Sequence, residues 1–551
     1  MSNTVSHVMG ENRQDLVVWH VLLFACALLL LRLSGIFNIY FFEEDEISIA
    51  AGVAALVRDN IGDLYRYSPQ LGYYRLLEII NLATGGVVAN IPLQMKVLSA
   101  FMGTLLPVLG LFAFRDTLSL RTRWLTALVL VANPVLWKSS QYGNSGLVSM
   151  VLACLAIVVL SNRPGRWLEV SALTLFCAAI IIRADVILLV PLLGWLVYRN
   201  HGSIGSMLLR GVLTASGLAA AYALIFMIDP RLDSAVSSVA THFSASRPSK
   251  FWEYMVWAIS PMPLFLAIVG ARKLLDSGPT LLLTLLLWLA GPLGFYFVST
   301  TTPRYFLLVA LPFAIVAAIG IEDVARRLAE LTRPAVAWGG VLFGAFVHLA
   351  VGLGHIQSGW VASALFAPGF RTDDGHMPTG ALVYDSHLRG GFLAQSFRNP
   401  GFSRVREPFW EGVAIEAMLD SLNQDWREEQ TVIVLLDAGF AHAFHYHAQA
   451  DGAAYLSRVP SQPWLPFSTE TWLQTGGARV MTVRRGTDDF AGMEQLSVRA
   501  GDEVWIIGDS GTLLEAELEK VPAGLFLTAI ESFDEKVFLY RVETRRNGLD
   551  G

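Results

Sequence analysis

The chain has 551 residues, of which 54% are hydrophobic and 16% are charged, and its mean hydropathy is +0.50. A composition this apolar excludes an ordinary soluble globular protein and is typical of a membrane protein. Residues 354–551 hold 16 Lys and Arg against 27 Asp and Glu, whereas the rest of the chain holds 24 against 19, so neither part predicts a nucleic-acid partner.

Long apolar runs fill the chain up to residue 353 and predict membrane-spanning helices, each of which needs about 20 apolar residues. The first run lacks the basic leader and the small-residue cleavage site of a signal peptide, so we interpret it as a retained span. Eleven runs are predicted to be spans: 16–33, 96–114, 124–138, 142–161, 167–182, 186–199, 204–228, 251–271, 279–299, 304–321 and 334–353.

The connections between the predicted spans differ in basic charge. Alternate connections hold Arg115, Arg121, Arg123, Arg163, Arg166, Arg199, Arg272, Lys273, Arg326, Arg327 and Arg333. By the positive-inside rule that side is cytoplasmic, and an odd number of spans then places the N-terminus there too. Residues 34–93, called loop one below, and residues 354–551 are therefore predicted to be external, in the periplasm or its equivalent. The chain is expected in the cytoplasmic (inner) membrane.

Loop one begins with an acidic cluster. Glu43, Glu44, Asp45 and Glu46 stand next to one another, and the apolar sequence IAAGVAAL follows shortly after them. This pattern predicts a helix at the membrane surface with the carboxylates at its N-terminus, where the helix dipole favours negative charge. Carboxylates this close repel one another, which raises their pKa. Such a cluster can hold a cation, accept a proton, or face water without a chemical role.

Several cations on the predicted external side run against the positive-inside pattern: Arg183, Arg231, Arg247, Lys250 and Arg304. Charges near bilayer depth are costly and usually functional. Arg304 directly precedes a span, where it can meet a phosphate or extend to ordinary lipid headgroups. Arg183 can instead pair with Asp185 across a tight turn. Lys138 and the polar run 139–146 can line a donor pocket or cap two helices.

Residues 354–551 predict an α/β domain. Strand-like runs at 381–385, 431–437, 478–483 and 503–509 alternate with helical stretches at 411–423 and 512–520, and residues 525–543 predict a closing hairpin. His442, His445 and His447 have no acidic residues at matched spacing, so we interpret them as surface or core histidines and not as a metal site. The sequence Gly-Asp-Ser-Gly at 508–511 lacks the flanking pattern of a nucleophile elbow.

Three motifs follow one another in the apolar part. An acidic pair of the form DExxxA (Asp45, Glu46, Ala50) is followed by a Pro/Tyr-rich stretch (Tyr67, Pro69, Tyr73, Tyr74), and RYFLLVALP, which runs from Arg304 to Pro312, starts a late span. Their order resembles the GT-C superfamily of integral membrane glycosyltransferases, especially the branch of protein O-mannosyltransferases and bacterial lipid A aminoarabinose transferases. Loop one departs from that family by having Tyr-Ser-Pro-Gln where relatives commonly have Pro-Pro, and by four consecutive acidic residues.

The resemblance implies a polytopic helical protein with a transmembrane catalytic domain at 1–353 and an external α/β domain at 354–551. It implies an inverting enzyme that moves a sugar from a polyprenyl-phosphate donor to a lipid, glycan or protein acceptor. Asp45 would be the general base, with Glu44 and Glu46 as the alternatives. The substrate-binding residues would be Arg304, Tyr305, Tyr67, Tyr74, Arg183, Arg247 and Lys250. A need for a divalent metal ion stays open, and no residue is assigned as a metal ligand.

Two other functions also fit a chain with many spans. A transporter would be expected to show an inverted repeat and charges in the middle of its spans. The sequence shows no such repeat, and most of its charges lie at the predicted external edge. A non-catalytic envelope assembly protein would use its membrane part as an anchor, for which eleven spans are excessive.

The predicted orientation can be tested by cysteine labelling in whole cells. We expect a cysteine introduced at Thr471, in the predicted external domain, to react with a reagent that does not cross the inner membrane. Reaction only after the inner membrane has been permeabilised would show that the orientation is wrong, and the assignment of an external loop one would be lost with it.

Overall fold

The computed structural model describes residues 18–36, 44–57, 70–140, 143, 145–228, 251–252, 255, 258–259, 261–298, 303–341, 343–344, 431–436, 444–449, 454–459, 470–475, 478–484, 500–507, 525–533 and 537–544. Within helices and strands, some side chains are not described; these include Glu44, Asp45, Glu46, Lys138 and Arg304. The predicted boundary at 353/354, the strand at 381–385 and the helices at 411–423 and 512–520 lie outside the described residues.

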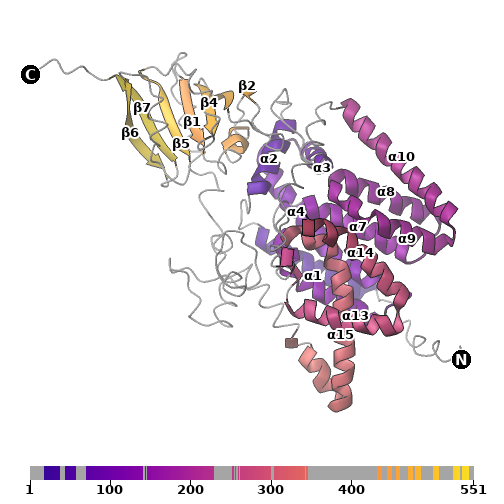
Figure 1. Ribbon diagram of the computed structural model, residues 1–551. Coiled ribbons are helices and arrows are strands. Elements are labelled where there is room, and N and C mark those ends of the chain that lie inside the picture. The colour runs from indigo at the N-terminus through magenta and orange to yellow at the C-terminus, as the bar shows by residue number, and fades with distance from the viewer. Residues whose placement is uncertain are drawn as a thin grey trace, which may run out of the picture.

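The N-terminal part is a bundle of helices (Figure 1). In chain order its labelled elements are α1 (Val18–Ile36), α2 (Glu44–Val57), α3 (Leu71–Ala83), η1 (Val88–Asn90), α4 (Ile91–Phe112), α5 (Leu120–Val131), α6 (Pro134–Ser139), α7 (Ser145–Ser161), α8 (Arg166–Ile182), η2 (Ala184–Leu189), α9 (Val190–His201), α10 (Ile204–Ile228), α13 (Pro261–Ser277), α14 (Pro279–Val298), η5 (Pro303–Phe306) and α15 (Leu307–Leu331). Helical residues occur in every one of the predicted spans.

Length and composition qualify only some of these helices as full spans. Among the described residues, four helices are long and apolar enough to cross a membrane: Val88–Phe112, Ile204–Leu224, Pro279–Val298 and Leu307–Leu331. Val18–Leu33 and Ser145–Ser161 are shorter apolar helices. The count of eleven spans therefore stays a prediction.

The outer surface of the bundle is apolar. Trp19 on α1 is 72% exposed, Trp167 on α8 is 84% exposed, and Leu213 on α10 is 63% exposed. A soluble protein seldom exposes so many large apolar side chains over one surface, whereas lipid tails are a suitable neighbour for them. The chain is a multi-pass membrane protein, as its composition predicts.

Two of the predicted spans are interrupted. The run 124–138 divides at Asn133 into α5 and α6, where the Asn133 side chain accepts a hydrogen bond from the Leu136 amide and donates one to the carbonyl of Ala258, both at 2.8 Å. Pro134 begins α6, a position that suits proline because its missing N–H would have no partner there. The run 186–199 starts with the 3₁₀ turns of η2 and only then continues as α9.

The basic connections gather at one end of the bundle. The Arg115 amide donates to the Asn162 side chain at 3.1 Å, which joins the α4–α5 connection to the α7–α8 connection. Arg199 at the end of α9 donates to the carbonyl of Ser161 at 2.6 Å. Thr122 contacts Glu322, in the last third of α15. These connections therefore lie at the same end of the bundle, as the positive-inside rule requires.

Glycines allow α13 and α15 to cross at close range. A Cβ atom added to Gly270 would lie 1.9 Å from the carbonyl oxygen of Val316, and one added to Gly320 would lie 2.0 Å from that of Leu266. Small residues at such crossings let helix backbones approach one another where no hydrophobic driving force exists between helices. The segment that follows η5 is thereby fixed against α13.

The C-terminal part contains a seven-stranded sheet in the order β2-β3-β4-β1-β5-β7-β6. Its strands are β1 (Thr431–Leu436), β2 (Ala454–Val459), β3 (Glu470–Thr475), β4 (Ala478–Arg484), β5 (Glu503–Ile507), β6 (Leu525–Phe533) and β7 (Val537–Thr544). Central β1 pairs in parallel with β4 and β5, and the other pairs are antiparallel. The predicted strands at 431–437, 478–483 and 503–509 and the closing hairpin are confirmed, whereas β2 and β3 were not predicted.

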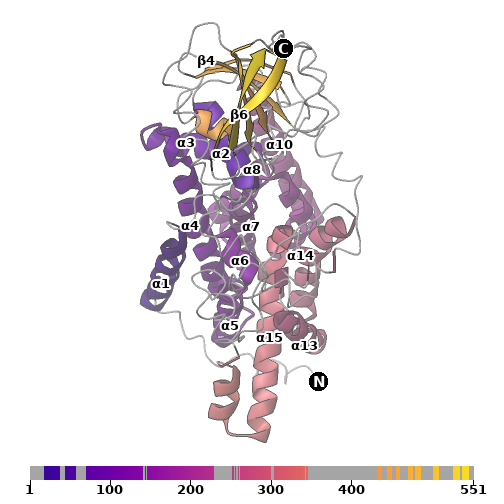
Figure 2. The same ribbon diagram turned by 90° about the vertical axis from the view of Figure 1, so that its left-hand side faces the viewer.

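The sheet lies at one end of the bundle, beside α2, in both views (Figures 1 and 2). A short helix at 444–449, which follows β1 in the chain, makes contact with loop one. The Gln449 side-chain amide donates to the carbonyl of Ala51 in α2 at 3.2 Å, and the Tyr446 hydroxyl lies 3.5 Å from the carbonyl of Val88 in η1. The C-terminal part thus rests on the segment that carries the acidic cluster.

The close crossing of α13 and α15 predicts an effect of one added methyl group. Gly320→Ala places a carbon against a backbone carbonyl that cannot move alone, so we expect a loss of about 1–3 kcal/mol and a lower Tm in thermal unfolding of the purified protein. Gly217→Ala on α10 is the control, because its Cβ would meet nothing within 4 Å. An equal Tm for both variants would show that the crossing is looser than described.

Candidate functional site

The acidic cluster lies at the start of α2, as predicted. Glu44, Asp45 and Glu46 form the first turn of this helix, and Glu43 lies outside the described residues. The following turns are buried, with Ala50, Ala51, Val53 and Ala54 at 0% exposure. Small apolar residues let neighbouring segments pack closely against α2, which fixes the helix whose positive dipole end carries the carboxylates.

Loop one returns to the bundle at the beginning of α3. The Ser145 hydroxyl, at the start of α7, donates to the side-chain oxygen of Gln70 at 2.7 Å. A Cβ atom on Gly72 would lie 2.6 Å from the carbonyl oxygen of Ile181, near the end of α8. Only glycine allows the first turn of α3 to lie this close to α8. Loop one is therefore held directly beside the residues that follow α8.

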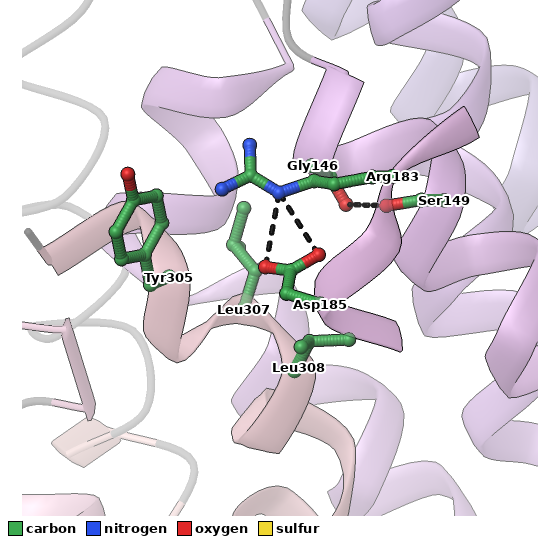
Figure 3. A pocket seen from close by; sticks show the side chains of 7 residues that line it. All are labelled: Gly146, Ser149, Arg183, Asp185, Tyr305, Leu307 and Leu308. Carbon is green, nitrogen blue, oxygen red and sulfur yellow. Dashed lines mark hydrogen bonds and ion pairs between the residues drawn. The ribbon is translucent and has the colours of Figure 1, made fainter. Parts of the chain in front are cut away.

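The residue that follows α8 is Arg183, which adopts an extended conformation and ends the helix. Its Nε atom donates to both carboxylate oxygens of Asp185, at 3.0 and 2.9 Å, and the two side chains are only 13% and 17% exposed. The guanidinium group also lies over the ring of Tyr305, 4.8 Å from the ring centroid (Figure 3). The predicted pairing of Arg183 with Asp185 is confirmed, and Tyr305 is added to it.

These three side chains line a small pocket that is open to solvent. Its other lining residues are Gly146, Ser149, Leu307 and Leu308. Gly146 belongs to the polar run 139–146, and whether this run lines a donor pocket stays a prediction. The pocket combines a cation, a carboxylate and an aromatic ring with two apolar side chains from the start of α15 (Figure 3). Such a mixture suits a ligand with an anionic head and an apolar chain.

The remaining predicted site residues are placed less completely. Arg304 lies in η5, one residue before Tyr305, and its side chain is not described. Tyr74 is buried in α3 at 4% exposure, away from solvent. Tyr67, Arg231, Arg247 and Lys250 lie outside the described residues. The structure thus brings Arg183 and Tyr305 together and leaves the roles of the others as predictions.

The structure describes two of the three histidines considered in the sequence analysis. His445 and His447 are buried in helix 444–449, at 1% and 3% exposure, which agrees with their interpretation as core residues. His442 and the Gly-Asp-Ser-Gly sequence lie outside the described residues. Among the described residues, no group of three His, Cys, Asp or Glu side chains could hold a metal ion.

Sequence reasoning did not single out several polar residues near this site. Ser149 lines the pocket and was not considered, whereas Gln70 and Ser145, which join loop one to the bundle, were included only as members of the Tyr-Ser-Pro-Gln stretch and of the polar run 139–146. Arg32 in α1 and Lys96 in α4 are buried cations, at 0% and 2% exposure, and Arg32 donates to the carbonyl of Leu136 at 3.3 Å. Arg32 and Lys96 carry a charge in a predicted apolar run, and that charge is the signal that could have identified them.

Comparison with known proteins was made at the level of sequence and of structure. No protein-family model matches the sequence, and no curated protein matches it. The crystal structure of ArnT from Cupriavidus metallidurans bound to undecaprenyl phosphate matches with a TM-score of 0.58 and 12% identity, over 96% of this chain and 99% of that chain. The fold is similar to that of ArnT.

The apo structure of ArnT from the same organism gives a TM-score of 0.57 and 12% identity, over 95% of this chain and 98% of that chain. The similarity therefore covers both the helical bundle and the sheet. It confirms the predicted fold class, a polytopic helical membrane protein with a C-terminal α/β part. At this level of identity it is a similarity of fold.

The pair at the centre of the pocket predicts a specific order of stabilities. Asp185→Ala leaves a largely buried guanidinium without its carboxylate, which costs more than removing both charges. We expect the Tm of Asp185→Ala to lie below that of the double variant Arg183→Met with Asp185→Ala, with a coupling free energy of about 1–2 kcal/mol in the double-mutant cycle that Arg183→Met completes. Additive effects would show that the pair contributes nothing to the fold.

Proposed function

We propose that this chain is a glycosyltransferase that moves a sugar from a polyprenyl-phosphate-linked donor to an acceptor on the outer side of the cytoplasmic membrane. The observation that carries this proposal is the junction of loop one with the Arg183–Tyr305 pocket, in a fold similar to that of a protein solved with undecaprenyl phosphate. The resemblance of three sequence motifs to the same superfamily is a second, separate support.

The pocket suits the donor. Arg183 and the neighbouring Arg304 would hold the carrier phosphate, because a guanidinium can bind two phosphate oxygens at once and stays charged at any accessible pH. Leu307 and Leu308 offer an apolar surface to the first part of the polyprenyl chain. Arg247, Lys250, Tyr67 and Tyr74 complete the proposed substrate-binding set from the sequence resemblance.

The first turn of α2 would supply the base. A carboxylate within hydrogen-bond reach of the acceptor takes the proton of its hydroxyl or amine while the oxygen or nitrogen attacks the anomeric carbon. The bond from that carbon to the carrier phosphate breaks, and the lipid phosphate leaves with its charge stabilised by the cations. A single displacement inverts the anomeric centre. Asp45 is the proposed base, because it fits the DExxxA pattern, and Glu44 and Glu46 are its neighbours.

The orientation follows from the basic end of the bundle. The connections that contain Arg115 and Arg199 would be cytoplasmic, and the opposite end, with α2, the pocket and the sheet, would be external. Residues 1–353 would form the catalytic membrane domain and residues 354–551 the external domain. The acceptor would be a lipid, a glycan or a protein that reaches loop one from the outside, with the external domain shaping its access.

The proposal is tested by Asp45→Asn in a transfer assay with a polyprenyl-phosphate sugar donor. This change keeps the shape of the side chain and removes its basicity, so turnover should fall by about 10² to 10⁴ while donor binding is retained. Arg304→Ala is the matched variant, which should weaken donor binding instead. Normal transfer by Asp45→Asn with loss in Glu44→Gln would move the base by one residue. Normal transfer by both would overturn the proposed function.

A further inference from the structure

The short helix at 444–449 is buried on all sides. Phe444, Tyr446, Ala448 and Gln449 are 0% exposed, and the two histidines between them are nearly so. A helix of six residues cannot cover its own surface, so other segments must enclose it. In both views of the molecule it lies beside α2, on the side of the sheet that faces the bundle (Figures 1 and 2).

One face of this helix meets loop one at two places. Tyr446 and Gln449 are three residues apart, so their side chains project from the same face. The Gln449 amide nitrogen donates to the Ala51 carbonyl at 3.2 Å, and the Tyr446 hydroxyl approaches the Val88 carbonyl in η1. The helix therefore contacts both α2 and the segment that leads into α4.

The environment of Gln449 is unusual for a residue that only fills space. Its Nε2 atom faces the Ala51 carbonyl, which leaves Oε1 on the opposite side, buried and without a hydrogen-bond partner among the described residues. An unsatisfied buried amide oxygen costs free energy that an apolar side chain of similar size would not. The bond to α2 offsets this cost only in part. A buried polar group without a partner is expected where a residue serves function and not only stability.

The bond reaches α2 close to the acidic turn. Ala51 follows Asp45 by six residues, which is about 9 Å along a helix at 1.5 Å per residue. A shift or rotation of α2 at Ala51 would therefore move the carboxylates with it, because the helix between them is continuous. In the chain, helix 444–449 follows β1, the central strand of the sheet, after seven residues.

We infer that helix 444–449 is a positioning element through which the external domain holds α2, and with it the proposed catalytic turn, at the junction with the bundle. Gln449 is the central positioning residue. The inference rests on the proposed function for what the acidic turn does, whereas the hold on α2 can be measured without any substrate.

The test compares Gln449→Met, which keeps the length of the side chain and removes its donor, with Gln474→Met as a control on the exposed surface of β3. Amide hydrogen exchange is measured on the full-length protein in lipid nanodiscs. Residues 44–57 should exchange roughly tenfold faster in Gln449→Met, the effect of one lost hydrogen bond, and within about twofold of the wild type in Gln474→Met.

The kinetic prediction separates positioning from general stability. With α2 displaced and the pocket intact, kcat of Gln449→Met should fall about tenfold or more, while KM for the polyprenyl-phosphate donor stays within about twofold. Unchanged exchange in α2 overturns the inference, and so does faster exchange with an unchanged kcat. If the wild-type protein transfers no sugar, the proposed function is refuted instead. The hydrogen-exchange measurement then still decides whether the helix holds α2.

A variant that loosens the whole domain is recognised by faster exchange in β1 and β5. In that case Tyr446→Phe decides, because it removes only one hydroxyl group from the same face. Faster exchange in α2 with an intact sheet supports the inference, and unchanged exchange in α2 overturns it.

Discussion

Backbone groups inside a bilayer find no water, so a chain can leave helical geometry there only where other protein groups accept or donate its hydrogen bonds. The candidate site depends on this constraint. The end of α8 at Arg183, the 3₁₀ turns of η2 and the 3₁₀ turn of η5 occur at the same end of the bundle and adjoin one another. Each interruption is enclosed by the others, which allows polar side chains to gather where continuous helices would present only apolar ones.

The Arg183–Asp185 pair is the electrostatic part of the same arrangement. Removing two charges from water is costly, and a buried pair recovers that cost only with good geometry and additional partners. Here Nε contacts both carboxylate oxygens, Ser145 lies 3.4 Å from Nη1, and the Tyr305 ring covers the guanidinium. As a unit the pair carries no net charge, and these contacts fix the guanidinium in one orientation beside the Tyr305 ring.

Much of the fold could be predicted because its signals are local. The apolar runs indicate the helices, the acids followed by IAAGVAAL indicate α2, and the apolar run of β1 indicates a strand buried between two parallel neighbours. β2 and β3 were missed because their sequences, AYLSRV and ETWLQT, mix polar and apolar residues and form no long apolar run. The interruption at Asn133 was missed as well, because its side chain replaces backbone partners through contacts that the sequence does not reveal.

The site itself was predictable only in part, since its decisive contacts join distant residues. Gln70 and Ser145 are 75 residues apart, and Ala51 and Gln449 are 398 apart. No periodicity or spacing specifies such pairs. The Arg183–Asp185 pair was predictable because only Ala184 separates its members, and the contribution of Tyr305 was not.

Loop one is held from two sides by contacts of different stiffness. On the bundle side, the backbone of α3 at Gly72 packs directly against the backbone of α8. This contact cannot lengthen without moving a whole helix. On the side of the sheet, the contacts are side chains at 3.2 and 3.5 Å, which is longer than the usual optimum near 2.9 Å. Because the Gly72 contact fixes α3 against α8, a force on the C-terminal part would move α2 more readily than α3. The acidic turn would shift relative to a pocket that stays in place.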